Sequence, residues 1–380
     1  MTLILDPAMR VIDKNHQIFI LHPGDGKRFY NDFRATSMVF LDIPGAILPT
    51  SFDIDDEKTR QQLRMSRSVG GWYKGGRPAT RVPSRKAEDY KVSAEGRDAP
   101  RYMREVKNLY EDAKPGDLVI IPGPGYTSEV LFAEILEPFV SDVFAEVARY
   151  NFEKIPARRV KFLKGSHAKY EFGRRAIKLM QNRQAIIRVS DDADRHEFYE
   201  HAYGDYVRGE SSGSYMEVTK AVVDQKDLTD VLFLTNYFGA MYVALKAGEL
   251  ENFIALSEKS LHKGLNAYYN RELFGDISIE VHSPGFFGRA LRDPAMAGFV
   301  AAMTVMATLA IDPVMATQLV VENSANSHQS VCDMTLQEDI RSTMQIVTNS
   351  HLWWDELCEM QKEASEQVGL KTKSKVIDKP

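Results

Sequence analysis

The sequence predicts an α+β chain made of two domains, a mixed first domain and a mainly helical second one. The chain has 380 residues, more than one ordinary domain contains. Up to about residue 208, short apolar runs alternate with turn residues, a pattern typical of short strands. Beyond the Gly/Ser-rich string GESSGS at 209–214, the patterns are helical. We expect domains at 1–208 and 215–370, followed by a disordered basic tail at 371–380.

The first domain contains six apolar runs that we expect to be strands, and between them lie turn and helix signals. Acidic residues lead a basic stretch at 53–67, as a helix N-terminus prefers. Residues 68–100 are rich in Gly, Pro and Arg and indicate a long exposed loop. Further helices are expected after residue 100 and at 172–183. The expected strands are IFIL (18–21), MVFLDI (38–43), LVIIP (118–122), LFAEIL (131–136), RRVKFLK (158–164) and AIIRVS (185–190).

The second domain is expected to be helical over 225–256, 294–311 and 335–368, with one strand at 276–281. Residues 295–311 form an uncharged run of 17 residues, at the short limit for crossing a bilayer. The run is rich in Ala, Thr and Met and has acidic flanks, which favours a buried core or oligomer-interface helix. Membrane contact through this run remains the alternative.

The chain has two cysteines, Cys332 and Cys358, too few for a disulfide framework and without metal-ligand spacing. Its start has no basic segment ahead of an apolar core, so no signal peptide is predicted. Both features favour a reducing cytoplasm. No cofactor motif is found, and we expect a binding protein rather than an enzyme.

The net charge of −5 hides a strong asymmetry along the chain. Residues 1–210 hold 34 basic and 31 acidic side chains, whereas residues 211–380 hold 14 and 22. Two blocks concentrate the positive charge: 58–107 carries 14 basic against 5 acidic residues, and 149–188 carries 12 against 2. Such blocks are the electrostatic signature of a polyanion-binding surface.

Glycine-rich strings and paired histidines do not complete a known motif. GDGK at 24–27, GGWYKGG at 70–76 and GPG at 123–125 lack the spacing of a nucleotide phosphate loop, so we interpret them as turns. In HEFYEH, His196 and His201 are five residues apart. On a helix they would point about 140° apart and could not share one zinc ion.

An acidic strand leaves a nuclease open as an alternative function. Asp276, Glu280 and His282 would share one face of the expected strand at 276–281 and could bind a metal ion. A solvated strand face would show the same pattern.

The strongest functional signal is the interleaving of basic and aromatic residues in the two basic blocks. Nucleic acid requires cations to neutralise phosphates and flat rings on which an unpaired base can stack. The first block contributes Trp72, Tyr73, Lys74, Arg77, Arg81, Arg85 and Lys86; the second contributes Arg158, Arg159, Lys161, Phe162, Lys164, Lys169, Tyr170, Arg174, Arg175 and Lys178.

The order of elements in residues 10–205 resembles the PUA-like/EVE-like reader domain, in the variant found at the N-terminus of Mrr-type restriction endonucleases and related defence proteins. The resemblance rests on a helix–turn–strand, then a second strand, a short helix and a last strand. The residues that match the family pattern are Val106, Lys114, Gly116, Asp117, Leu118, Val119 and Pro122, then Val160, Lys161, Phe162 and Leu163. Phe162 stands where the family often has Trp, and the stretch 68–100 is longer than usual.

The resemblance implies a small twisted β-barrel with flanking helices that binds a modified or flipped base of DNA or RNA in an aromatic pocket. Candidate pocket rings are Trp72, Tyr73, Tyr126 and Phe162, whereas Asp117 is expected to form a turn. The implied function is nucleic-acid sensing in bacterial anti-phage defence or restriction. The helical domain would then serve as an effector or form a homo-oligomer.

Overall fold

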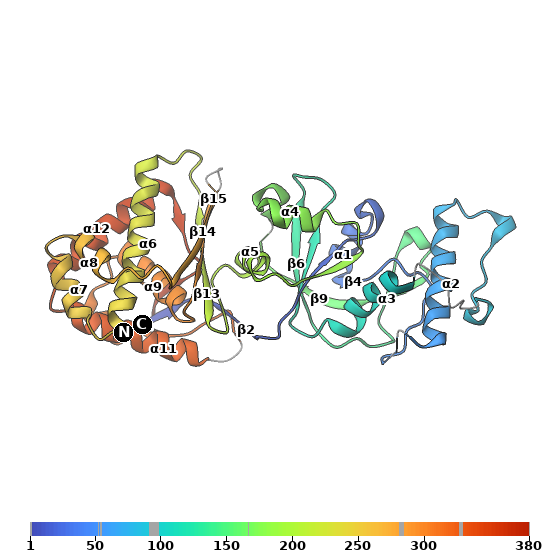
Figure 1. Ribbon diagram of the computed structural model, residues 1–380, viewed down its shortest axis with the longest axis horizontal. Coiled ribbons are helices and arrows are strands. Elements are labelled where there is room, and N and C mark those ends of the chain that lie inside the picture. Colours follow the sequence, from blue (N-terminus) through green and yellow to red (C-terminus); the bar gives the residue numbers. More distant parts are fainter. Residues whose placement is uncertain are drawn as a thin grey trace. The chain divides into compact units, whose positions relative to one another are not determined.

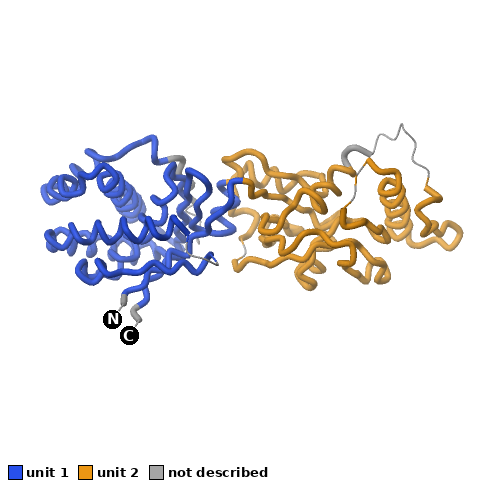
Figure 2. The backbone as a smooth tube through the Cα atoms, turned by 90° about the horizontal axis from the view of Figure 1, so that it is seen from below, with its two compact units in different colours: residues 1–14, 196–380 blue, residues 15–195 orange. Residues whose placement is uncertain are grey.

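The chain divides into two compact units, and one is inserted in the sequence of the other (Figure 2). The inserted unit comprises residues 15–195, and the terminal unit comprises residues 1–14 with 196–380. The expected boundary near residue 208 therefore moves, because residues 2–6 pair with residues 375–379 and residues 10–12 pair with residues 206–208. The computed structural model describes residues 2–51, 53, 55–90, 99–165, 167–280, 285–326 and 330–379.

A curled mixed sheet forms the centre of the inserted unit (Figure 1). Five of the six expected strands form close to their predicted positions, and only two residues of the expected strand at 38–43 are extended. A separate hairpin joins β7 (Phe144–Glu146) and β8 (Lys154–Pro156). The sheet order is β11 (Ile186–Val189), β3 (Ile18–Leu21), β5 (Leu118–Pro122), β6 (Glu129–Ile135), β9 (Arg158–Phe162) and β4 (Met38–Val39), with β10 (His167–Ala168) also pairing with β6.

Strands β3 and β5 are the only parallel pair among the described strands of this sheet, in the register Ile18↔Leu118. Every residue of both strands is buried. Their continuous apolar runs, IFIL and LVIIP, are what strands covered on both faces require. The pairing fixes which loops of the unit meet, because both strands end at the same edge of the sheet.

The described part of this unit also contains four α-helices: α1 (Tyr30–Thr36), α2 (Glu57–Lys74), α3 (Ala99–Lys107) and α4 (Arg174–Met180). Helix α2 starts at its N-cap Asp56, whose side chain accepts a hydrogen bond from the Thr59 amide. It continues through residues 68–74, which the sequence led us to expect in a loop. The buried residues Leu63, Ser66 and Val69 recur at helical spacing, so packing of this face outweighs the poor helix propensity of two glycines.

The terminal unit is also α+β rather than mainly helical. Its larger sheet has the order β14 (Phe274–Glu280), β15 (Gly285–Leu291), β13 (Ser211–Val218), β12 (Tyr206–Arg208) and β2 (Arg10–Ile12), and β17 (Leu370–Lys371) also pairs with β13. Its smaller sheet has the order β16 (Val320–Val321), β1 (Thr2–Asp6) and β18 (Lys375–Lys379).

The helices of the terminal unit enclose α9 (Met296–Thr308), whose residues are nearly all buried. The run at 295–311 thus contains a core helix, as expected, over residues 296–308. Helices α6, α9 and α12 lie on one side of the β13–β15 sheet (Figure 1). The expected helix at 335–368 is two helices, separated at residues 348–350. The helices are α5 (Asp192–Tyr203, which contains the unit boundary), α6 (Gln225–Lys246), α7 (Leu250–Ser257), α8 (Leu261–Tyr268), α9 (Met296–Thr308), α10 (Pro313–Ala316), α11 (Val331–Val347) and α12 (His351–Val368).

One described helix, α6, is long and apolar enough to cross a membrane by length and composition. It has 22 residues and a mean hydropathy of 1.3, and half of its most apolar window is buried inside the protein. Core helices pass the same test, so this finding is weak evidence for a membrane span.

Residues 375–379 form a strand, which corrects the expectation of a disordered tail over this part of 371–380. Strand β18 pairs antiparallel with β1, in a register that runs from Thr2↔Lys379 to Asp6↔Lys375. Val376 packs against the apolar core. The tail is too polar to be recognised as a strand alone, and its partner lies at the opposite end of the sequence.

Candidate nucleic-acid interface

The parallel pairing of β3 and β5 brings two glycine-containing turns together at one edge of the sheet. Strand β3 runs directly into His22–Lys27, and β5 runs into Gly123–Tyr126. Strand β11 is antiparallel to β3 and therefore begins at the same edge. The His22 amide donates to the Ala185 carbonyl at 2.8 Å, which joins the segment before β11 to the turn after β3.

A cleft of about 1090 Å³ opens at this edge of the inserted unit. All three glycine-rich strings that we interpreted as ordinary turns contribute to its wall. Tyr126 lines the cleft and is largely exposed, and Lys74 of α2 also lines the cleft. The lining residues are His22, Gly24, Asp25, Gly26, Lys27, Asp42, Arg67, Gly70, Gly71, Lys74, Tyr102, Glu105, Pro124, Gly125, Tyr126, Lys169, Met180, Gln181, Asn182, Arg183, Gln184 and Ala185.

Positive charge predominates in this cleft, because five lysine and arginine side chains line it against three carboxylates. Two of those carboxylates already have partners. Asp42 forms ion pairs with Arg28 and with Lys74, the latter at 3.3 Å. Glu105 accepts a hydrogen bond from the Ala185 amide at 3.0 Å. The acidic groups therefore hold the walls in place and leave part of the positive charge unneutralised.

His22, Lys27 and Lys169 form what we call the basic floor of the cleft. The Lys27 ammonium donates to His22 Nδ1, and Lys169 Nζ donates to the carbonyls of Gly123 and Gly125 at 2.8 and 3.1 Å. His22 and Lys169 are only 8% and 6% exposed. Among the described residues, neither lysine forms an ion pair with a carboxylate.

Burial and mutual repulsion lower the pKa of every group in the basic floor. Burial lowers the pKa of His22 to about 3, and the charges of Lys27 and Lys169 add to this effect. Burial lowers the pKa of Lys27 to about 7, and the charge of Lys169 adds to it. Burial also lowers the pKa of Lys169. Nearby positive charges that disfavour one another are expected where a protein prepares to bind an anion.

Of the four rings proposed for a base pocket, only Tyr126 lines the cleft. Trp72 packs against its own loop, since its Nε1 donates to the Pro78 carbonyl at 3.1 Å. Tyr73 packs edge-on against Trp72 and Tyr150, with ring centroids 4.9 and 5.1 Å away. Phe162 is half-buried against the sheet core. These three rings stabilise the unit instead of facing the cleft.

The basic residues named from the sequence occupy different environments. Lys74 lines the cleft. Arg77 lies over the Tyr73 ring at 4.9 Å and donates to the Arg149 carbonyl, which anchors the loop after α2. Arg81, Lys161 and Lys164 are exposed outside the cleft lining. Arg159 is exposed and forms an ion pair with Glu137 at 2.9 Å.

Arg158 is a structural residue, which corrects its assignment to the nucleic-acid surface. Its side chain is 1% exposed, and its guanidinium donates to the carbonyls of Leu109, Ala113 and Glu137 at 2.6–3.1 Å. A buried guanidinium with three backbone partners cannot reach a phosphate in this conformation. Asp117 is a turn former as expected, since its carboxylate accepts from the amides of Gln17 and Lys114 at 2.7 Å.

The side chains proposed for a nuclease lie outside the described part of the structure. The backbone of β14 carries Asp276 and Glu280, but their side chains are not described, and neither is His282. Among the residues that are described, no group of three or more His, Cys, Asp or Glu side chains could hold a metal ion.

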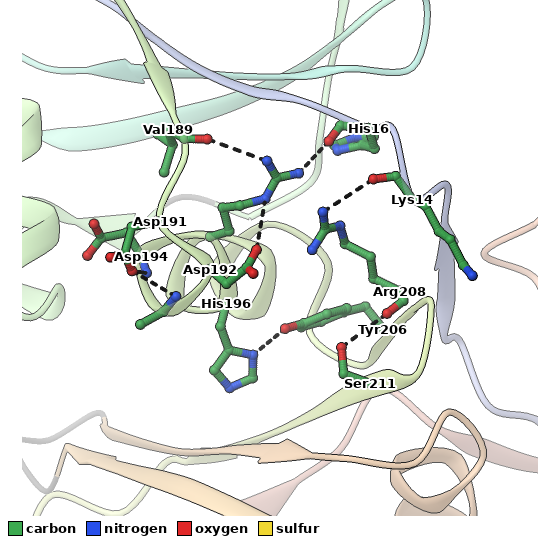
Figure 3. Close-up of polar contacts among 12 residues, drawn as sticks. Lys14, His16, Val189, Asp191, Asp192, Asp194, His196, Tyr206, Arg208 and Ser211 are labelled. Atoms are coloured by element: carbon green, nitrogen blue, oxygen red, sulfur yellow. Dashed lines mark hydrogen bonds and ion pairs between the residues drawn. The ribbon is translucent and has the colours of Figure 1, made fainter.

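The histidines of HEFYEH have structural partners, in line with the rejection of a zinc site. His196 Nδ1 contacts the Tyr206 hydroxyl (Figure 3), and His196 Nε2 lies 3.1 Å from Glu200 Oε1. The string GESSG at 209–213 matches the G-x-S-x-G pattern of serine nucleophiles. However, Ser211 begins the second strand of the β12–β13 hairpin and donates to the Arg208 carbonyl at 3.0 Å (Figure 3). A nucleophile elbow needs a turn from a strand into a helix.

Several cleft residues were not predicted from the sequence as site residues, namely His22, Lys27, Arg67, Tyr102 and Arg183. The available signal was the recurrence of glycine-rich strings directly after apolar runs. Each string is too weak a motif by itself, and only the strand order shows that they meet.

Searches against protein-family models, curated proteins and solved structures find no match to this chain. The function is therefore argued from the geometry of the cleft.

We expect Arg158 and Arg159, neighbours on β9, to respond oppositely to substitution by methionine. Arg158→Met leaves three buried carbonyls without their donor and should lower the free energy of unfolding by about 3 kcal/mol. Arg159→Met removes an exposed ion pair and should change it by less than about 0.5 kcal/mol. Chemical denaturation of both variants measures the difference. Equal small effects would contradict the structural role of Arg158.

We expect Lys27→Met to raise the midpoint temperature of unfolding at pH 7, because it removes a poorly compensated positive charge. The pKa of Lys27 lies near 7 in the folded protein and near 10.5 in the unfolded chain, so the unfolded chain binds more protons between these values. The unfolding midpoint of the parent protein should therefore rise from pH 7 to pH 10.5. The difference in midpoint between the parent protein and Lys27→Met should become smaller over the same range. Thermal unfolding from pH 7 to pH 10.5 tests this, with exposed Lys86→Met as control. If Lys27→Met unfolds at a lower temperature than the parent protein at pH 7, the Lys27 ammonium is stabilised by its surroundings and the prediction is wrong.

Proposed function

We propose that this chain is a nucleic-acid-sensing protein whose inserted unit holds an unpaired or flipped base, with its adjoining phosphates, in the cleft. The observation that carries the proposal is a cleft with excess positive charge and an exposed tyrosine in its wall. Cations supply the sequence-independent attraction to phosphates, and an exposed ring supplies a stacking surface for any base.

Tyr126 is the ring best placed to stack on a base. Its side chain is 57% exposed, and its ring centroid lies 6.3 Å from that of Tyr170, which is also exposed. Both tyrosines therefore present ring surface to solvent beside a positively charged cleft. Phe162, which matches the ring position of the reader family, packs against the core, so in our proposal Tyr126 takes its place as the base contact.

The curled mixed sheet with flanking helices supports assignment of the inserted unit to the PUA-like/EVE-like readers, and we propose that assignment. The ligand would be DNA or RNA with a modified or unusual base. By the same resemblance we propose a role in bacterial anti-phage defence or restriction, in the cytoplasm. Both cysteines are free thiols, which suits a reducing compartment.

We propose that the terminal unit forms a homo-oligomer and transmits the binding signal. Helices α10 and α11 pack together and expose apolar side chains. Val314 and Met315 on α10 are 56% and 43% exposed, and Val331 and Met334 on α11 are 72% and 48% exposed. Each helix thus exposes a pair of apolar side chains close together in its own sequence, and exposed apolar side chains are typical of protein interaction surfaces.

Binding of fluorescent single-stranded and duplex oligonucleotides, followed by anisotropy over a range of salt concentrations, tests the reader function. The affinity should fall steeply with salt, and Lys74→Ala should reduce the slope by about one phosphate contact. Tyr126→Ala should weaken binding roughly tenfold, as expected for loss of one stacked base, and Tyr126→Phe should retain it. Lys226→Ala, an exposed lysine of the terminal unit, is the matched control. No binding at low salt, or a flat salt slope, would refute the proposal.

Light scattering during size-exclusion chromatography tests the oligomer. The parent chain should elute with a mass that is a multiple of the monomer mass, and Val331→Glu with Met334→Glu should shift it to the monomer. Val222→Glu, at a separate site with 85% exposure, should have no effect. A monomeric parent chain at micromolar concentration would contradict the oligomer.

A further inference from the structure

We propose that the basic floor binds a terminal phosphate, the phosphomonoester of a nucleotide or of a nucleic-acid end, so that the cleft recognises a phosphorylated end rather than an internal backbone position. The inference rests on the proposed function only for the identity of the molecule that carries the phosphate. The three side chains of the floor carry the inference through their geometry, burial and hydrogen-bonding state.

The floor presents hydrogen-bond donors that the protein itself does not satisfy. A charged Lys27 ammonium can only donate to His22 Nδ1, and in that state the neutral imidazole carries its proton on Nε2. That nitrogen is buried and has no hydrogen-bond partner among the described residues. His22 is more than nine-tenths buried and lines the cleft, so a polar group of a ligand can satisfy Nε2–H there.

The two lysines of the floor add positive charge without a protein counter-ion. Lys169 gives two of its N–H groups to the carbonyls of Gly123 and Gly125 and keeps a third. Lys27 gives one N–H to His22 and keeps two. Burying ammonium groups without a carboxylate partner is costly, and a bound anion would offset that cost.

The charge and number of donors fit a phosphomonoester better than a phosphodiester. A monoester has three terminal oxygens and carries nearly two negative charges at pH 7, whereas an internal backbone phosphate has two free oxygens and one charge. The floor offers donors from three side chains, two of which end in an amine that can carry positive charge. The other charged groups that face the cleft are Asp25, Asp42, Glu105, Arg67, Lys74 and Arg183, and among these Asp42 and Glu105 are engaged in the walls.

Backbone strain also marks the turn that carries Lys27. Lys27 has a φ of 59°, a left-handed conformation that is uncommon for a residue with a Cβ atom. Gly24 in the same turn has a φ of 72°, and a Cβ atom there would lie 2.6 Å from the Phe29 ring. The turn is thus held in a conformation that places the Lys27 amine against His22.

The test measures the affinity of the full chain for three oligonucleotides of one sequence at a fixed salt concentration. One oligonucleotide carries a 5′-phosphate, one a 3′-phosphate and one no terminal phosphate. One phosphorylated end should bind at least about tenfold more tightly than the unphosphorylated oligonucleotide, as expected for charge-assisted hydrogen bonds. Lys27→Met should abolish that preference, so that the three oligonucleotides bind to the variant with equal affinity. Lys86→Met, an exposed lysine outside the cleft lining, should keep the preference. Equal binding of all three oligonucleotides, or a preference that survives in Lys27→Met, would overturn the inference.

Thermal shift with small ligands separates this inference from the proposed function. A nucleoside monophosphate should raise the unfolding midpoint of the parent chain but not of Lys27→Met, and the matching nucleoside should raise neither. An equal shift with inorganic phosphate would show that the site binds free phosphate.

If no oligonucleotide binds but the nucleoside monophosphate still raises the unfolding midpoint, the nucleic-acid function is refuted and the phosphate site is supported. No shift with either phosphate ligand, together with no preference for phosphorylated ends, refutes the site. The unfolding midpoint of Lys27→Met without ligand shows that the variant is folded, which separates loss of the site from misfolding.

Discussion

The parallel pairing of β3 with β5 is the constraint on which the candidate site depends. It places the carboxyl ends of two strands, separated by about a hundred residues of sequence, at one edge of the sheet. The turns that follow these strands supply His22, Lys27 and Tyr126. The antiparallel neighbours β11 and β6 bring the segment before β11 and the segment containing Lys169 to the same edge. In α/β sheets, ligands commonly bind where such loops converge.

A second feature of the cleft is that two of its carboxylates have partners in the walls, whereas the lysines of the floor have no carboxylate partner among the described residues. Asp42 and Glu105 are engaged by side chains and backbone amides of the walls, so they contribute little to neutralising the floor. Lys27 and Lys169 are held close to His22 by burial and by hydrogen bonds to uncharged acceptors. A protein that needed only stability could bury an apolar residue in place of Lys27. Retaining an amine there suits a site that is completed by an anion.

Local sequence patterns predicted the strands well, because apolar runs such as IFIL and LVIIP are buried on both faces. They failed where long-range packing decides. Helix α2 extends through two glycines because its Leu63–Val69 face is buried, and β18 is a strand because β1 pairs with it. The nested arrangement of the two units follows from the same end-to-end pairing. For the site, composition correctly located the positive charge but could not distinguish buried Arg158 from exposed Arg159, since alternate residues of β9 face opposite sides.

The central claim is tested most directly by measuring the pKa of the Lys27 amine. A pH titration monitored by NMR of the side-chain ¹³Cε and ¹⁵Nζ nuclei gives this pKa, and the Lys27→Met variant assigns the signals. We expect a pKa near 7 in the free protein, since burial and the charge of Lys169 disfavour the ammonium form. A phosphorylated ligand in the cleft should raise this pKa clearly, because an adjacent anion stabilises the ammonium. A pKa near the ordinary 10.5 both with and without the ligand would contradict an uncompensated basic floor.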